Sequence, residues 1–176
     1  NNEVQNYTGG GLYFNGGDIN IVGSTLYGNT SHTGGGGIFI TDQATVTVLN
    51  SILYNNLQIQ TESQNNVHIV NGNLTVFYSD IEDINNSITE DDSFTNIIDI
   101  SSETNISLNP LFCNADSSDF TLYDNSPCVG TGQDGANMGA YGVGCYQDII
   151  EPPDTLWTKI YGGDDNDVGR SVLQTN

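Results

Sequence analysis

The most marked shortage in this chain is positive charge. Its 176 residues include only two basic side chains, Lys159 and Arg170, against 22 acidic ones, which gives a formal net charge of −20. Nucleic-acid binding depends on cationic contacts to phosphate, and anionic membrane surfaces also attract basic residues. The composition therefore argues against a nucleic-acid partner and against an anionic membrane partner.

Sulfur-containing residues and long apolar runs are also scarce. Met138 is the only methionine and residue 1 is an asparagine, so we expect a piece of a longer protein. No apolar run approaches the ~20 residues of a membrane helix, and no membrane insertion is expected. The three cysteines, Cys113, Cys128 and Cys145, lie late in the chain without the spacing of a zinc site. They favour an extracellular or cell-surface protein with one disulfide and one free thiol.

What the chain does contain is an internal repeat. The stretches INIVGSTLYGN, VTVLNSILYNN and LTVFYSDIEDI begin at Ile19, Val46 and Leu74, which are 27 and then 28 residues apart. Each stretch has apolar residues at its first, third and eighth positions and a serine at its sixth. Alternating β-branched residues predict strands, and self-similarity at this period is typical of a solenoid. We therefore predict an all-β fold, a parallel β-helix whose coils of short strands stack ~4.8 Å apart.

The repeat also indicates which side chains face inward. The first, third and eighth positions should be buried and stacked: Ile19, Ile21, Leu26, Val46, Val48, Leu53, Leu74, Val76 and Ile81. The positions between them should point outward, because successive side chains of a strand alternate between its faces: Asn20, Thr47 and Thr75.

Glycine and asparagine mark the predicted turns. Glycine runs at residues 9–11 and 34–37 are expected where the chain turns in little space between coils, which glycine tolerates best. Asn29 and Asn56 occupy equivalent positions, and we expect their side chains to form an amide ladder along the axis.

The last part of the repeat region has the most specific pattern. Residues 109–145, NPLFCNADSSDFTLYDNSPCVGTGQDGANMGAYGVGC, contain Asn-Pro-Leu-Phe, Asp-Phe-Thr-Leu, Ser-Pro-Cys and Met-Gly-Ala-Tyr-Gly. Together with the repeat, this pattern resembles the right-handed parallel β-helix family of bacterial secreted and surface proteins. The resemblance implies coils over residues 1–108, truncated on the N-terminal side, and a closing or capping segment over residues 109–147.

The remaining expectations concern the cysteines and the end of the chain. We expect Cys113 to pair with Cys128, because the ~15-residue loop between them returns readily within one coil. Cys145 would then be free, and a bridge to Cys145 is the alternative. Residues 148–155 have the composition of a linker. Residues 156–176 resemble the incomplete start of a propeller-type repeat.

Enzymatic activity is considered because β-helices often carry polysaccharide lyases and hydrolases. Pectate-lyase-like catalysis uses an arginine base with Ca²⁺, and residues 1–158 contain neither Arg nor Lys. Glycoside hydrolysis needs two carboxylates, and Asp80, Glu82 and Asp83 form an acidic group near a turn. We interpret this group as solvated loop charge, with a Ca²⁺ site as the first alternative and catalysis as the second. No other cofactor is expected.

Aromatic residues recur in two columns of the repeat. Tyr13, Phe39 and His68 occupy the middle of successive strands and should line an outer face, whereas Tyr27 and Tyr54 form a second column. Such side chains stack on one another across a sheet, and they also stack on sugar rings. We interpret both columns first as ladder packing and, in the alternative, as a glycan-binding surface.

The resulting functional hypothesis is a non-catalytic β-helix region of a large secreted or surface-anchored bacterial protein. It would serve as a structural stalk or as an adhesive surface, with glycans or other cell-surface components as partners. We expect no enzymatic activity from this segment by itself. The alternative is part of a carbohydrate-active enzyme, a polysaccharide lyase or glycoside hydrolase, whose catalytic coils lie outside the chain.

Overall fold

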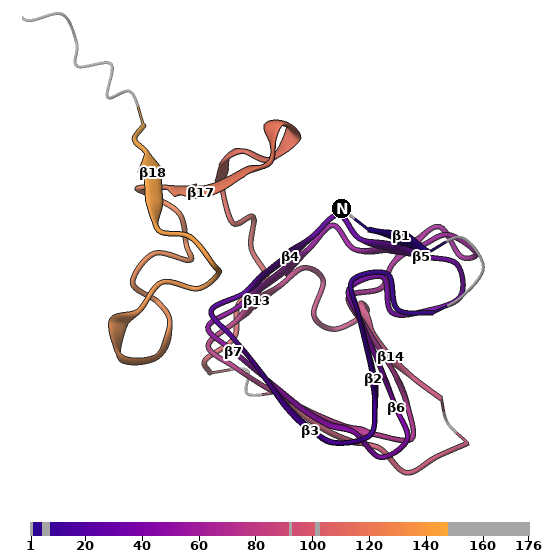
Figure 1. Ribbon diagram of the computed structural model, residues 1–176. Coiled ribbons are helices and arrows are strands. Elements are labelled where there is room, and N and C mark those ends of the chain that lie inside the picture. Colours follow the sequence, from indigo (N-terminus) through magenta and orange to yellow (C-terminus); the bar gives the residue numbers. More distant parts are fainter. Residues whose placement is uncertain (1, 5–7, 92, 101–102, 148–176) are drawn as a thin grey trace, which may run out of the picture.

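The computed structural model of the protein describes residues 2–4, 8–91, 93–100 and 103–147 (Figure 1). The chain is nearly all β and forms a β-solenoid of about three turns, so the predicted fold class is confirmed. Within these ranges no helix is long and apolar enough to cross a membrane. The predicted linker, 148–155, and the predicted start of a following repeat, 156–176, lie outside the described residues.

The strands of successive turns lie above one another in three main parallel stacks, which outline a triangle in Figure 1. The first stack holds β2 (Leu12–Asn15), β6 (Ile38–Thr41), β11 (Val67–Val70) and β14 (Ile88–Glu90). The second holds β3 (Asp18–Val22), β7 (Thr45–Leu49), β12 (Asn73–Phe77) and β15 (Ile97–Ile100). The third holds β4 (Thr25–Tyr27), β8 (Ile52–Tyr54) and β13 (Asp80–Ile81).

Two smaller sheets complete the fold. One corner of the solenoid carries a short fourth stack: β1 (Glu3–Val4), β5 (Thr30–Ser31), β9 (Leu57–Gln58) and β10 (Ser63–Gln64), the last antiparallel to β9. The closing segment holds β16 (Phe112–Asn114), β17 (Asp119–Tyr123) and β18 (Val143–Cys145). Two 3-10 turns, Ala115–Ser117 and Gln133–Gly135, lie in the same segment.

The inward faces of the three main stacks form one continuous apolar core, as predicted. Six of the expected core residues are fully buried: Val46, Val48, Leu53, Leu74, Val76 and Ile81. Each such side chain contributes roughly 1.5–3 kcal/mol by its burial. Ile21 and Leu26 are nearly buried and Ile19 is half-buried, because β3 and β4 are the end strands of their sheets. The outward positions are more exposed than the core: Asn20, Thr47 and Thr75.

Polar ladders run along the axis beside this core. The Nδ2 atom of Asn29 donates to Oδ1 of Asn56 at 3.0 Å, and Nδ2 of Asn56 donates to Oδ1 of Asn66 at 2.8 Å. The backbone N–H of Ser24 donates to Oγ of Ser51 at 3.1 Å. The predicted amide ladder is therefore confirmed, and the recurring serine has a similar bridging role.

The glycine runs lie where the coils come closest together. A Cβ on Gly10 would lie 2.6 Å from the carbonyl oxygens of Gly36 and Thr30. A Cβ on Gly37 would lie 2.5 Å from the carbonyl oxygen of Asn66. Backbone atoms cannot yield at such distances, so a side chain is excluded sterically, as predicted.

The closing segment packs along the outer face of the third stack, on the flank of the solenoid (Figure 1). Its contacts reach more than one coil: Ala140 N–H donates to Oγ1 of Thr25 at 3.0 Å, and Gln133 N–H donates to Oδ1 of Asn50 at 2.7 Å. A second apolar core fills the space between the segment and the solenoid: Ile52, Leu122, Cys128 and Met138.

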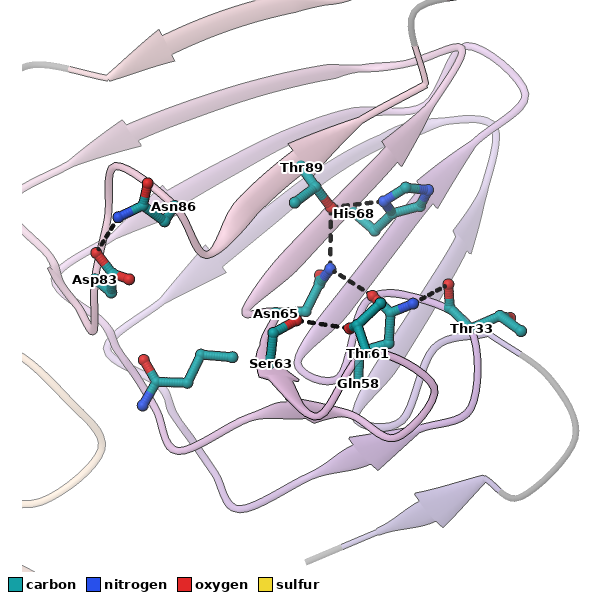
Figure 2. Close-up of a pocket in the computed structure, with 10 residues that line it drawn as sticks. Thr33, Gln58, Thr61, Ser63, Asn65, His68, Asp83, Asn86 and Thr89 are labelled. Atoms are coloured by element: carbon teal, nitrogen blue, oxygen red, sulfur yellow. Dashed lines mark hydrogen bonds between the residues drawn. The ribbon is translucent and has the colours of Figure 1, made fainter.

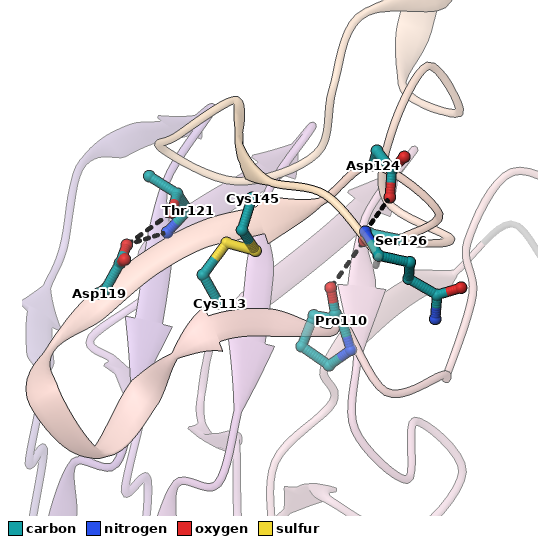
Figure 3. The surroundings of a disulfide bond; sticks show 8 residues. Pro110, Cys113, Asp119, Thr121, Asp124, Ser126 and Cys145 are labelled. Carbon is teal, nitrogen blue, oxygen red and sulfur yellow. Dashed lines mark hydrogen bonds between the residues drawn. A yellow bond between two sulfur atoms is a disulfide. The ribbon is translucent and has the colours of Figure 1, made fainter. Parts of the chain in front are cut away.

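The disulfide joins Cys113 to Cys145, with a Cα–Cα distance of 6.0 Å (Figure 3). The predicted Cys113–Cys128 pairing is therefore wrong, and Cys128 is the free thiol. The physical reason is the direction in which the side chain of Cys128 points. Cys128 is fully buried in the second core, where its Sγ donates to a carboxylate oxygen of Asp80 at 3.2 Å. The two bonded cysteines lie on β16 and β18, the outer strands of the small sheet of the closing segment.

Candidate ligand-binding pocket

The first aromatic column is a stack of rings on the outer face of β2, β6 and β11. The centroids of Tyr13 and Phe39 lie 5.3 Å apart with an interplanar angle of 4°, and those of Phe39 and His68 lie 5.5 Å apart at 30°. Phe39 is enclosed between its neighbours and is only 7% exposed, whereas Tyr13 is 52% exposed. The column therefore packs on itself, and a ligand meets it only at its two ends.

The second aromatic column packs against the closing segment. The rings of Tyr27 and Tyr54 are parallel, with centroids 6.4 Å apart. Tyr27 also contacts Phe112 at 5.6 Å and Phe120 at 5.1 Å, both from the closing segment. This column thus anchors the segment to the solenoid flank, with a small space of about 250 Å³ left beside it.

A larger polar pocket, of about 510 Å³, lies at the His68 end of the first column (Figure 2). Its walls come from the hairpin β9–β10, from β11 and β14, and from the turns after β5 and β13. All the lining side chains are polar: Thr33, Gln58, Thr61, Ser63, Gln64, Asn65, His68, Asp83, Asn86 and Thr89. Two of the predicted candidates, His68 for ligand and Asp83 for metal, therefore meet in one pocket.

The pocket exists because the third coil takes a shorter path than the second. Between Asn56 and Asn66 the second coil makes the excursion that contains β9 and β10. The third coil turns at once, because the N–H groups of Asn86 and Ser87 both donate to the carbonyl of Asp83 at 2.8 Å. No third-coil strand among the described residues pairs with β9 or β10. The unequal lengths of these two turns are visible in the sequence, and they are the signal from which the pocket could have been predicted.

A hydrogen-bond network holds the pocket walls in place. Nδ2 of Asn65 donates to Oε1 of Gln58 at 3.1 Å and to Oγ1 of Thr89 at 3.0 Å. The same Thr89 hydroxyl lies 2.7 Å from Nδ1 of His68. Nε2 of Gln58 donates to the carbonyl of Thr33 at 3.0 Å. The hairpin is therefore tied both to the third coil and to the first.

The imidazole of His68 favours its uncharged form. Burial lowers its pKa below the ordinary value of 6.5, although the charge of Asp91 acts in the opposite direction. Because Nδ1 is occupied by Thr89, Nε2 is the ring nitrogen left for a ligand. Asp83 is the one acidic residue of the lining, and one of its carboxylate oxygens accepts from Nδ2 of Asn86 at 2.8 Å.

The acidic group predicted as loop charge or Ca²⁺ site is divided among three surroundings. Asp83 lines the polar pocket, and Glu82 accepts from the backbone N–H of Asn55 at 2.6 Å. Asp80 is fully buried, so its interpretation as solvated charge is wrong. Its side chain points outward from β13, but the closing segment covers that face. Across the described part of the chain, no three His, Cys, Asp or Glu side chains gather in a way that could hold a metal ion.

Burial governs the chemistry of Asp80. Its carboxylate accepts from the backbone N–H of Leu108 at 3.1 Å and from the thiol of Cys128 at 3.2 Å. Burial raises its pKa from 3.8 to about 6, against the opposing effect of these two hydrogen bonds. Burial also raises the pKa of Cys128, with the Asp80 charge adding to the effect, and this disfavours the nucleophilic thiolate.

Comparison of the chain with known protein families, with curated proteins and with solved structures gave no match.

Proposed function

We propose that this chain is a non-catalytic β-helix region of a larger secreted or surface-anchored protein, of the bacterial type that its sequence resembles. It acts as a rigid spacer whose polar pocket, beside the first stack, binds glycans at a cell surface. The observation that carries the proposal is the polar pocket beside the aromatic column. Concave polar sites next to an aromatic ring are suited to sugars, which offer hydroxyl groups and an apolar ring face.

The arrangement of carboxyl groups supports binding rather than catalysis. Hydrolysis of a glycosidic bond uses two carboxyl groups that face the same bond. Asp83 is the only one that lines the pocket. Asp80, whose raised pKa would suit a general acid, is sealed beneath the closing segment and contacts Leu108 and Cys128 instead.

The disulfide supports an extracellular setting. The Cys113–Cys145 bond closes the small sheet of the closing segment, and such bonds persist mainly in oxidising compartments. The high negative charge also suits a solvated surface protein that remains soluble at high local concentration.

The test is to pass the full chain over immobilised polysaccharides of plant, fungal and bacterial origin. Retention and the release of sugar products are measured on the same samples. We expect retention on a subset of the glycans with no release of reducing or unsaturated sugars. Retention on none of them, or release of such products, would contradict the proposal.

A further inference from the structure

We propose that the pocket lined by Gln64, His68 and Asn86 selects an uncharged sugar residue and rejects acidic glycans. This inference rests on the proposed glycan-binding function and assigns it a site and a ligand class. It follows from the polar groups left free in the pocket, from the charges around it and from the rigidity of its walls.

The free polar groups match hydroxyl groups. The side chain of Gln64 has no protein partner in the described part of the chain. In the same part of the chain, the hydroxyl of Thr33 and Oδ1 of Asn86 are also free (Figure 2). Nε2 of His68 is a further open position. An amide, a hydroxyl and an uncharged imidazole together both donate and accept. A sugar hydroxyl does the same, so each ligand hydroxyl can be paired in both roles.

The charges around the pocket exclude anionic ligands. A bound carboxylate, sulfate or phosphate needs a cationic partner or several N–H donors aimed at it, and burial without them is unfavourable. No Lys or Arg is present among the described residues, because the only two in the chain are Lys159 and Arg170. Burial lowers the pKa of His68 and so favours its uncharged imidazole, and the carboxylate of Asp83 lies on the wall. An acidic sugar would therefore meet the Asp83 carboxylate with no cationic side chain among the described residues to offset the repulsion.

The walls are arranged before any ligand binds. The side chain of Asn65 is saturated, because its Oδ1 accepts from Gly35 N–H at 3.1 Å while its Nδ2 donates to Gln58 and Thr89. These bonds join three coils around the pocket, so little ordering is required on binding. The volume of about 510 Å³ lies within the range of sites for small ligands and accommodates one or two sugar rings.

The experiment measures binding of soluble oligosaccharides to the full chain by calorimetry and by chemical-shift changes. The probes are uncharged tetrasaccharides of glucose, galactose, mannose and xylose, compared with tetragalacturonate. We expect at least one uncharged probe to bind and tetragalacturonate to bind at least tenfold more weakly. Gln64→Ala should weaken the binding about two- to tenfold, the range for losing one or two hydrogen bonds.

Two further variants test whether binding occurs in this pocket and whether charge determines the ligand class. Gln60→Ala changes the same residue type in the same hairpin outside the pocket lining and should leave affinity unchanged. Asp83→Lys places a cation on the wall and should strengthen tetragalacturonate binding about threefold, the scale of exposed charge pairs.

The outcomes separate this inference from the proposed function. Binding of an uncharged probe that Gln64→Ala weakens and Gln60→Ala does not would support both. Binding that neither variant alters would overturn the assignment of the pocket and leave the glycan-binding function standing. Preferential binding of tetragalacturonate would overturn the ligand class alone. Binding of no probe, together with no retention on any polysaccharide, would overturn the proposed function itself.

Discussion

The substitution Asp80→Asn should stabilise the protein at neutral pH. Asp80 faces outward from β13 but lies beneath the closing segment, next to the thiol of Cys128. Its pKa is raised from 3.8 to about 6 by burial. The folded state therefore binds this proton more tightly than the unfolded state does. A shift of this size corresponds to about 3 kcal/mol.

The sign and the pH window follow from linkage between protonation and folding. Below about pH 4 the carboxyl is protonated in both states, and its effect on stability is absent. As the pH rises toward 6, the unfolded chain ionises first and the folded protein is increasingly destabilised. Above about pH 6 the loss is complete. Asparagine has the same shape and keeps an acceptor for Leu108 N–H, so the variant should gain up to about 3 kcal/mol above pH 6 and almost nothing at pH 4.

The assay is urea unfolding of both proteins at five pH values from 4 to 8, followed by circular dichroism. The difference between the two free energies of unfolding isolates Asp80, because all other groups are common to both. Asn20→Ser, on the exposed face of β3, is the control and should stay within about 0.5 kcal/mol at each pH. A variant that is less stable than the parent above pH 6, or a difference that does not change with pH, would refute the reasoning.

Three further predictions concern the ladder, the disulfide and the aromatic column. Asn56→Ala removes a fully buried side chain that hydrogen-bonds to Asn29 and Asn66. The unfolding free energy, measured by urea titration, should fall by about 2–4 kcal/mol. An unchanged value would count against a stabilising role of the amide ladder. Reducing the Cys113–Cys145 bond should lower the free energy of unfolding by about 2–4 kcal/mol. In mass mapping, Cys128 should remain unmodified by alkylating reagents until the chain unfolds. Tyr13→Ala, at the exposed end of the column, should weaken retention on a glycan surface about two- to tenfold without altering the circular dichroism spectrum; equal retention would limit binding to the pocket end.

The coils were predictable because a parallel solenoid aligns equivalent residues of neighbouring turns. Where coils are of nearly equal length, hydrogen bonding in register pairs Ile19, Val46 and Leu74 in space at the same spacing that separates them in sequence. The same rule places Asn29 above Asn56. Apolar residues that alternate within each short strand and recur at the spacing of one coil therefore predict the fold from the sequence alone.

The contacts between the closing segment and the flank of the solenoid were not predictable in the same way. Alternation indicates that Asp80 faces outward, but it contains no information on what covers that face. The covering residue, Cys128, lies 48 positions further on and follows no repeat. The choice of disulfide failed for the same reason, because loop length alone does not reveal that the side chain of Cys128 points into a second core.

The pocket depends on a departure from the repeat rather than on the repeat itself. His68 was found because it continues the column of Tyr13 and Phe39. Gln64 and Asn86 were not, since they belong to turns of different length in the second and third coils. In a solenoid, differences in length between equivalent turns create hollows on the surface, and these differences are visible in the sequence.

The position of the closing segment has a mechanical consequence. The hydrogen bonds between coils run along the solenoid axis, so tension on that axis would peel off one coil at a time. Each coil of 27 residues would release roughly 90 Å of chain. The closing segment is bonded to Thr25, Asn50 and Asp80, which belong to three successive coils. It therefore links those three coils on the flank, so a coil can unwind past its contact residue only after its hydrogen bond to the closing segment has broken.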